Sequence, residues 1–263
     1  MKPISSSPHS IHKNCAYHII NTDLNRDLIT SWQAWAEKVQ AGSEELRNIA
    51  LIRLMDCLKY GDHKLDLSGL NLTALPEIFP KKVKELDLSH NQLTTLSQSL
   101  PPEIETLDVS YNQLSSLDEN VPKTLDTLNI SHNRLAHLNL SQLSDLNASH
   151  NQLIYLQDNL PDTLELLNIS YNQLTHIDLP RTLKMLNASH NQLTSLDLPQ
   201  TLKILNASHN QITHLQENLP KLNELNVSHN RLTSLPDVLL TYDYTSRNLV
   251  LNVEHNRLCQ SKK

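Results

Sequence analysis

The chain has 263 residues, a formal net charge of −6 and a pI near 6.1, an acidic balance that argues against nucleic-acid binding. It contains only three glycines, so neither GxGxxG nor GxxxxGKS/T can be written and no phosphate-cradling loop is expected. No run of 18 apolar residues occurs, so no membrane span is predicted. Leucine supplies 52 residues whereas aromatic residues reach only 4%, which indicates one aliphatic packing unit used many times.

Residues 1–23 are predicted to form a disordered leader that is a candidate secretion signal. The stretch from Met1 to His18 is polar and rich in serine, and it lacks the apolar core of a Sec signal peptide. The three cysteines, Cys15, Cys57 and Cys259, lie far apart without CxxC spacing. They are predicted to be reduced thiols in a cytosol, without a disulfide framework or a zinc site.

Residues 24–61 are predicted to form a cap of two helices. The first has an apolar face at helical spacing and is expected to stop at Gly42. The second is expected to start at Ser43, with Glu44 and Glu45 in its first turn, and to end at Gly61. The apolar faces consist of Leu28, Trp32, Trp35, Ala36 and Val39, and of Leu46, Ile49, Ala50, Leu54, Cys57 and Leu58. A cap over the exposed first strand is favoured over a cofactor role for the tryptophan pair.

Residues 62–258 consist of a repeat. The segment LDLSHNQL at residues 86–93 returns as LDVSYNQL at residues 107–114, and eight further copies follow or precede these two. The shared pattern is LxxLxLxxNxL, the leucine-rich repeat, numbered here from position 1 to position 11. Position 9 holds asparagine in nine copies: Asn91, Asn112, Asn133, Asn151, Asn172, Asn191, Asn210, Asn230 and Asn256. Leu70 takes that place in the first copy.

The repeat predicts an α/β solenoid with a parallel concave sheet of about ten strands. Positions 4 and 6 alternate inward on a short strand, and position 11 fills the core after the chain turns. The asparagine of position 9 is expected to face inward, where its amide bonds to the backbone of the neighbouring turn, as a structural ladder. Spacings of 18 to 21 residues leave no room for a helix on the back of most repeats, so extended segments with turns are expected there.

The last spacing is longer and breaks the register. Residues 238–248 are predicted to be an insertion before a final strand at residues 249–253, and residues 259–263 a short tail.

This layout resembles the leucine-rich-repeat effectors that Gram-negative bacteria inject by type III secretion, of the IpaH, SspH and YopM kind. The resemblance covers roughly residues 24–258. It rests on WQAW at residues 32–35, DCL at 56–58, the first repeat LDLSGLNL at 65–72, and Leu-Pro pairs at 160–161, 179–180 and 198–199. It implies secretion by a bacterium, action in the host cell cytoplasm and a host protein as partner.

In IpaH-type members a separate C-terminal E3 ubiquitin ligase domain carries a catalytic cysteine, and none is expected in these 263 residues. Cys259 lacks the Cys-x-Asp context of that nucleophile. The resemblance therefore leaves two alternatives. The chain is a recognition-only member, or it is the recognition part of a longer ligase that binds a substrate of the ubiquitin pathway.

Catalytic residues, cofactors and metal ions are not expected. Asp66, Asp87 and Asp108 occupy position 5 of the first three copies, where a solvated acidic face is favoured over an acid–base pair. Serine recurs at position 7, and a column of identical serines indicates a repeat feature and not a nucleophile. Position 8 holds a ring in nine copies: His90, Tyr111, His132, His150, Tyr171, His190, His209, His229 and His255. A metal ladder is an alternative to a ring column inherited by copying.

The outward-facing positions decide binding. Position 3 is polar in the first five copies, becomes Leu166, Met185 and Ile204, and returns to Glu224. Such a patch marks a partner site unless curvature shields it. The predicted partner-binding residues are Leu166, Met185, Ile204, Tyr171, Asn168, Asn187, Asn206, His190 and His209. A binding module for a host protein is the leading hypothesis, with ligase substrate recognition and a purely structural scaffold as alternatives.

Overall fold

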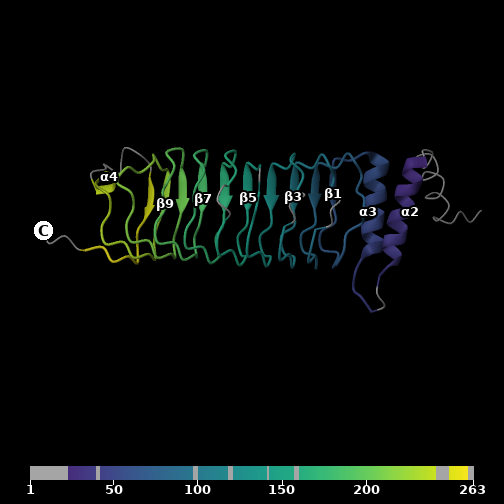
Figure 1. Cartoon of the computed structure of the whole chain (residues 1–263), viewed down its shortest axis with the longest axis horizontal. Coiled ribbons are helices and arrows are strands. Elements are labelled where there is room, and N and C mark those ends of the chain that lie inside the picture. The colour runs from purple at the N-terminus through teal and green to yellow at the C-terminus, as the bar shows by residue number, and fades with distance from the viewer. Residues whose placement is uncertain are drawn as a thin grey trace, which may run out of the picture.

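The computed structural model describes residues 23–39, 42–96, 100–117, 121–140, 142–156, 160–240 and 249–259. These residues form an elongated solenoid with two helices at its N-terminal end (Figure 1). Helix α2 spans Asp23–Glu37, α3 spans Arg47–Tyr60 and the short α4 spans Asp237–Leu240. The strands are β1 Lys64–Asp66, β2 Glu85–Asp87, β3 Thr106–Asp108, β4 Thr127–Asn129, β5 Asp145–Asn147, β6 Leu166–Asn168, β7 Met185–Asn187, β8 Ile204–Asn206, β9 Glu224–Asn226 and β10 Val250–Asn252.

All ten strands belong to one parallel sheet in sequence order, and equivalent repeat positions pair across every strand boundary. The leucine at position 4 is the central residue of each strand, and in β1 to β9 it is at most 3% exposed. The aliphatic side chains of positions 6 and 11 join it in one continuous core. The predicted leucine-rich-repeat solenoid, with its ten-stranded sheet and its N-terminal helical pair, is confirmed.

In the described residues, the backs of most repeats contain turns, because these repeats are too short for helices; the longer segment after β9 contains α4. In several repeats the N–H of position 1 donates to a proline carbonyl three residues earlier, as Leu164 does to Pro161 and Leu183 to Pro180. Proline fixes φ near the value that such a turn needs. These repeats therefore stack turns of the same kind behind their strands.

The two helices are shorter than predicted. Helix α2 ends at Glu37, before the expected stop at Gly42, and α3 begins at Arg47 and not at Ser43. Leu46, predicted on the apolar face of the second helix, immediately precedes it and is 42% exposed. The acidic residues after Ser43 do not form a first helical turn, because the Glu45 side chain bonds to the first repeat instead. Gly61 ends α3 as predicted, in the left-handed conformation with φ 66°.

A buried ion pair fastens this cap to the sheet. Arg47 Nε lies 2.7 Å from Glu45 Oε2, and both side chains are less than one-tenth exposed. Glu45 Oε1 accepts hydrogen bonds from the backbone N–H and the hydroxyl of Thr73 in the first repeat. Arg47 also donates to the carbonyl of Trp35 and lies over its ring. The Trp32 Nε1–H donates to the carbonyl of Ile78 at 2.7 Å, so the tryptophan pair has a structural part in the cap.

Some expectations about the chain ends fall outside the described residues. Residues 1–22 and 260–263 are among these, as are residues 241–248 of the expected insertion. Asp23, expected in the leader, belongs to α2, and the final strand is Val250–Asn252, shorter than the expected 249–253.

Candidate functional site

The position-9 asparagines bond to the backbone on both sides of each repeat boundary. Asn172 Oδ1 accepts the N–H of Leu153 in the preceding repeat, and its Nδ2 donates to Ala148 O of that repeat and to Ile169 O and Ser170 O of its own. The same contacts recur from Asn91 to Asn256. Eight of these side chains are buried, and that of Asn256 in the last repeat is partly exposed. This arrangement gives the buried amides their partners and connects each turn to the next.

On the concave face, three apolar residues interrupt the polar residues of position 3. Leu166, Met185 and Ile204 are neighbours across β6, β7 and β8. Met185 is 42% exposed, whereas Leu166 and Ile204 are half-buried. Asp145 precedes this strip on β5, and Glu224 follows it on β9. The strip is therefore a short apolar surface, most prominent at Met185, between two acidic residues.

The position-5 residues next to this strip have a local role that the sequence reasoning missed. Asn168 Oδ1 accepts hydrogen bonds from both the N–H and the hydroxyl of Ser170, and Asn187 and Asn206 do the same for their own serines. Such Asx turns explain why positions 5 and 7 repeat together. With the oxygen engaged, the NH₂ group, a donor, is the remaining polar group of each amide.

The residue type at position 5 changes along the sheet. In the first strands it is Asp66, Asp87 and Asp108, which use the same acceptor geometry. At the change from aspartate to asparagine, Asn129 Nδ2 donates to Asp108 Oδ2 at 2.9 Å. The concave face therefore presents carboxylates on β1 to β3 and amide donors from β4 onward.

The position-8 rings form one uninterrupted stack. The centroids of neighbouring rings are 4.0–4.3 Å apart from His90 to His255, and the planes of most pairs lie about 10° apart. Every ring residue has a φ of 52° to 55°, the left-handed region, which histidine and asparagine tolerate better than most residues. The sequence predicted the column, but the positive φ follows from the tight turn after each strand. Among the described residues, no group of three or more His, Cys, Asp or Glu is placed to hold a metal ion.

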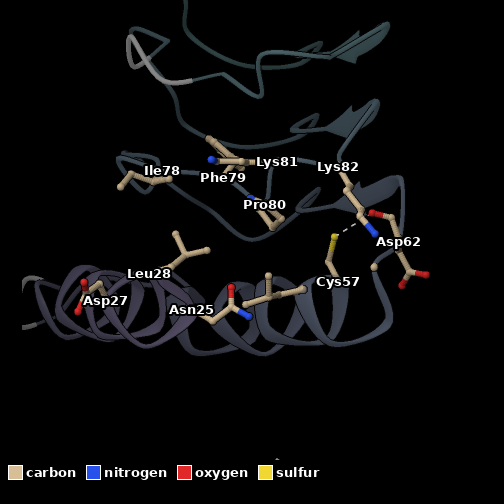
Figure 2. A pocket seen from close by; sticks show the side chains of 12 residues that line it. Asn25, Asp27, Leu28, Cys57, Asp62, Ile78, Phe79, Pro80, Lys81 and Lys82 are labelled. Atoms are coloured by element: carbon tan, nitrogen blue, oxygen red, sulfur yellow. Dashed lines mark hydrogen bonds between the residues drawn. The ribbon is translucent and has the colours of Figure 1, made fainter. Parts of the chain in front are cut away.

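A cavity in the cap was not predicted. Figure 2 shows side chains of the two helices, Leu28 and Cys57 among them, pointing across it toward the loop that carries Phe79 and Lys82. Its volume is about 440 Å³ and its lining is mostly apolar. Burial, followed by the charge of Asp62, raises the pKa of the Cys57 thiol to about 11, so this thiol is neutral at physiological pH. A neutral, buried thiol is a poor nucleophile, which gives the cavity no catalytic group at Cys57.

Comparison with known proteins identifies the repeat and its bacterial relatives. The family model "Leucine Rich Repeat" matches residues 82–105 and 221–241. The outer membrane protein YopM of Yersinia pestis is 35% identical over 60 residues, which make up 23% of this chain and 15% of that protein. In the described part of this chain, no helix is long and apolar enough to cross a membrane.

Two solved structures share the architecture. YopM from Yersinia enterocolitica WA-314 is 27% identical, with a TM-score of 0.51, and the match covers 89% of this chain and 74% of that one. The functional domain of InlJ from Listeria monocytogenes, described as including a cysteine ladder, has a TM-score of 0.68 at 23% identity. That match covers 88% of this chain and 60% of the InlJ chain, and it bears on the fold alone.

Proposed function

We propose that this chain is the protein-binding module of a secreted bacterial effector and that it binds a host protein on its concave face. The observation that carries the proposal is the apolar strip of Leu166, Met185 and Ile204 across β6 to β8. Elsewhere along the described sheet position 3 is polar or charged, except at Val250 on the last strand. The similarity to YopM supports an effector of this kind, acting in the host cell cytoplasm.

The chemistry of the strip defines what it would bind. A partner that places an apolar side chain over Met185 also meets the NH₂ groups of Asn168 and Asn187 beside it. Such donors suit backbone carbonyl or carboxylate oxygens of the partner. Burying the exposed surface that the three apolar side chains retain would contribute on the order of 2–4 kcal/mol at about 25 cal/mol per Å². Ordering costs reduce this contribution, so hydrogen bonds at the rim of the strip are needed as well.

The ring residues that were predicted to contact the partner would lie at the margin of the proposed binding surface. Tyr171, His190 and His209 lie in the ring stack, beyond the C-terminal ends of β6, β7 and β8. Tyr171 is 46% exposed, so a partner that extends past the strand ends would meet its ring edge. We expect these three residues to extend the strip without forming its centre.

The alternative is substrate recognition for an IpaH-type E3 ligase domain outside these residues. It uses the same strip, and the substrate then takes the place of the host target. The sequence match spans only 15% of the curated YopM, so activities of whole relatives are not transferred to this chain. The length of the native gene product distinguishes the two alternatives.

The test is capture of a host protein, followed by direct binding of the purified partner. Met185→Glu is expected to weaken binding at least tenfold without unfolding the solenoid, because position 3 does not face the core. Val250→Glu is the matched control, since it places the same charge at the same repeat position on β10, where Val250 is 66% exposed. Equal binding by Met185→Glu and the wild type would exclude the strip, and the acidic end at Asp87 would be the next candidate.

A further inference from the structure

The turn that follows each strand forms an edge of unusual composition. We define the histidine edge as the outward-facing side chains of positions 8, 10, 12 and 13, counted along each repeat. It contains ten of the chain's 14 histidines: the seven of the ring stack together with His137, His176 and His214. It also contains Arg134, Arg231 and Arg257, and no aspartate or glutamate occurs at positions 8 to 13 of any copy. The chain has a net charge of −6, but this edge combines histidines and arginines without a carboxylate.

The ring stack holds seven of these histidines in one line. Each ring packs face to face on the next at 4.0–4.3 Å, so the faces are covered and only the ring edges meet solvent. The densest part lies beside β7 to β10, where His190, His209, His229 and His255 follow one another without a tyrosine. Arg231 and Arg257 lie two residues after His229 and His255, at position 10.

Few carboxylates of the described residues lie close enough to favour protonation of these imidazoles or to neutralise the charge that they gain. Glu254 acts on His229, and Asp178 lies 3.2 Å from His176. The carboxylates of Asp87 and Asp108, on the strands before His90 and Tyr111, accept hydrogen bonds from Ser89 and Ser110. Burial, and then the neighbouring imidazoles, lower the pKa of His132, His190, His209 and His229 from the ordinary value of 6.5. These four imidazoles are therefore mostly neutral at pH 7.5 and gain positive charge in mild acid.

We propose that the histidine edge docks onto an anionic phospholipid surface when its imidazoles are protonated. Each proton added to this edge makes the net charge less negative than the −6 that the chain has with neutral histidine. Each imidazolium presents N–H donors at the ring edge, the part that the stack leaves accessible, and lipid phosphates and carboxylates are the matching acceptors. Cations close to an anionic membrane each add roughly a fivefold gain in binding.

Two observations favour a bilayer over a nucleic acid. Single-stranded nucleic acids bind by stacking bases on aromatic faces, and here the ring faces are already paired with one another. The same edge exposes Tyr111, Tyr171, Tyr155 and Ile154, each at about half of its surface. Tyrosine is enriched where protein meets the headgroup region of a membrane, because its ring is apolar and its hydroxyl is polar.

The direct test is cosedimentation of the chain with vesicles at two pH values. Vesicles of phosphatidylcholine with 30% phosphatidylserine, a composition of about one-third anionic lipid, are compared with pure phosphatidylcholine vesicles. We expect binding to the anionic vesicles at pH 5.5, loss of binding at pH 7.5, and weakening by salt. Circular dichroism at both pH values establishes that the chain is folded. Absence of binding at pH 5.5 by the folded chain would overturn the proposal.

Variants then assign the binding to the edge. Replacing His190, His209 and His229 by asparagine, which tolerates the same positive φ, should weaken binding at pH 5.5 on the order of 100-fold. The matched control replaces Arg181, Lys203 and Lys221, exposed cations of the same repeats away from the edge, by glutamine, and should bind like the wild type. If both triple variants lose the same affinity, the attraction is general and the edge is not the site.

A gain-of-charge variant tests the edge without acid. His209→Arg with His229→Arg should bind the anionic vesicles at pH 7.5, whereas Gln142→Arg with Asn223→Arg, which adds two cations at exposed positions before the strands, should not. Binding of single-stranded RNA by the wild type at pH 5.5 without any vesicle binding would instead assign the edge to nucleic acid. The strip variant Met185→Glu should bind vesicles normally, so this result is independent of the proposed protein partner.

Discussion

Replacing a single ladder asparagine tests what holds consecutive repeats together. Asn172→Leu removes an acceptor and a donor group from a side chain that is only 9% exposed. The Leu153 N–H then loses its hydrogen bond to Asn172 Oδ1, and no other described acceptor takes its place. The carbonyls are less affected, because Ala148 O still accepts from Asn151 and Ile169 O still accepts from Asn191.

The expected cost follows from this count of lost partners. One buried backbone donor left without an acceptor costs about 1–3 kcal/mol. Chemical denaturation measures the change as a lower midpoint with an unchanged slope. Gln173→Leu, at the exposed neighbouring position, is the control and should change stability by less than about 0.5 kcal/mol.

The ladder asparagines differ in burial along the solenoid, and this difference provides a second test. Asn256 in the last repeat makes the same bonds, including the one from Leu232 N–H, but its side chain is partly exposed. Water can replace some of its contacts, so Asn256→Leu should cost less than Asn172→Leu. Equal stability of Asn172→Leu and the wild type, or a larger loss at Asn256, would refute the reasoning from burial.

Three further predictions concern other parts of the chain. The histidines whose pKa is lowered on folding bind more protons in the unfolded chain, so the free energy of unfolding should fall as the pH drops below about 6.5; matching denaturation midpoints at pH 7.5 and pH 5.5 would contradict this. Arg47→Met should cost about 3–5 kcal/mol by leaving Glu45 buried without its partner. Adding Glu45→Gln should recover part of that loss, and an additive double variant would argue against the pair. Finally, we expect no ubiquitin thioester on the exposed Cys259, and a thioester that disappears in Cys259→Ala would reverse that expectation.

The fold could be predicted because each repeat has the same pattern of core residues. Leucine at position 4, aliphatic residues at positions 6 and 11, and asparagine at position 9 of nine copies specify a strand, a turn and a buried amide ladder, and ten copies exclude coincidence. The cap was predicted less well, since its boundaries depend on tertiary contacts. Glu45 has the composition of a first helical turn, but its carboxylate bonds to Thr73 in the first repeat, and α3 therefore begins later.

The surfaces were predicted in part, for a physical reason. Position 3 could be assigned to the concave face from strand alternation alone, but the half-burial of Leu166 and Ile204 depends on how the strands pack. The cap cavity depends on the distance between two helices and a loop, which no local pattern encodes. The positive φ of the ring residues follows from the tight turn after each strand, where Gly69 takes the same position in the first copy with φ 66°.

Because most repeat positions have a structural role, only a few positions remain that can determine which partner the solenoid binds. Positions 4, 6, 9 and 11 build the core, and positions 5 and 7 form the Asx turn, as Asn187 and Ser189 do. The predicted binding role of Asn168, Asn187 and Asn206 is therefore limited to their amide donors, since their oxygens are used within the repeat. Positions 2 and 3 have neither of these structural roles, and their residue types vary most along the sheet. Those two columns are therefore where the sheet of this solenoid differs from another with the same core, and at position 3 the change from charged to apolar occurs between Asp145 and Leu166.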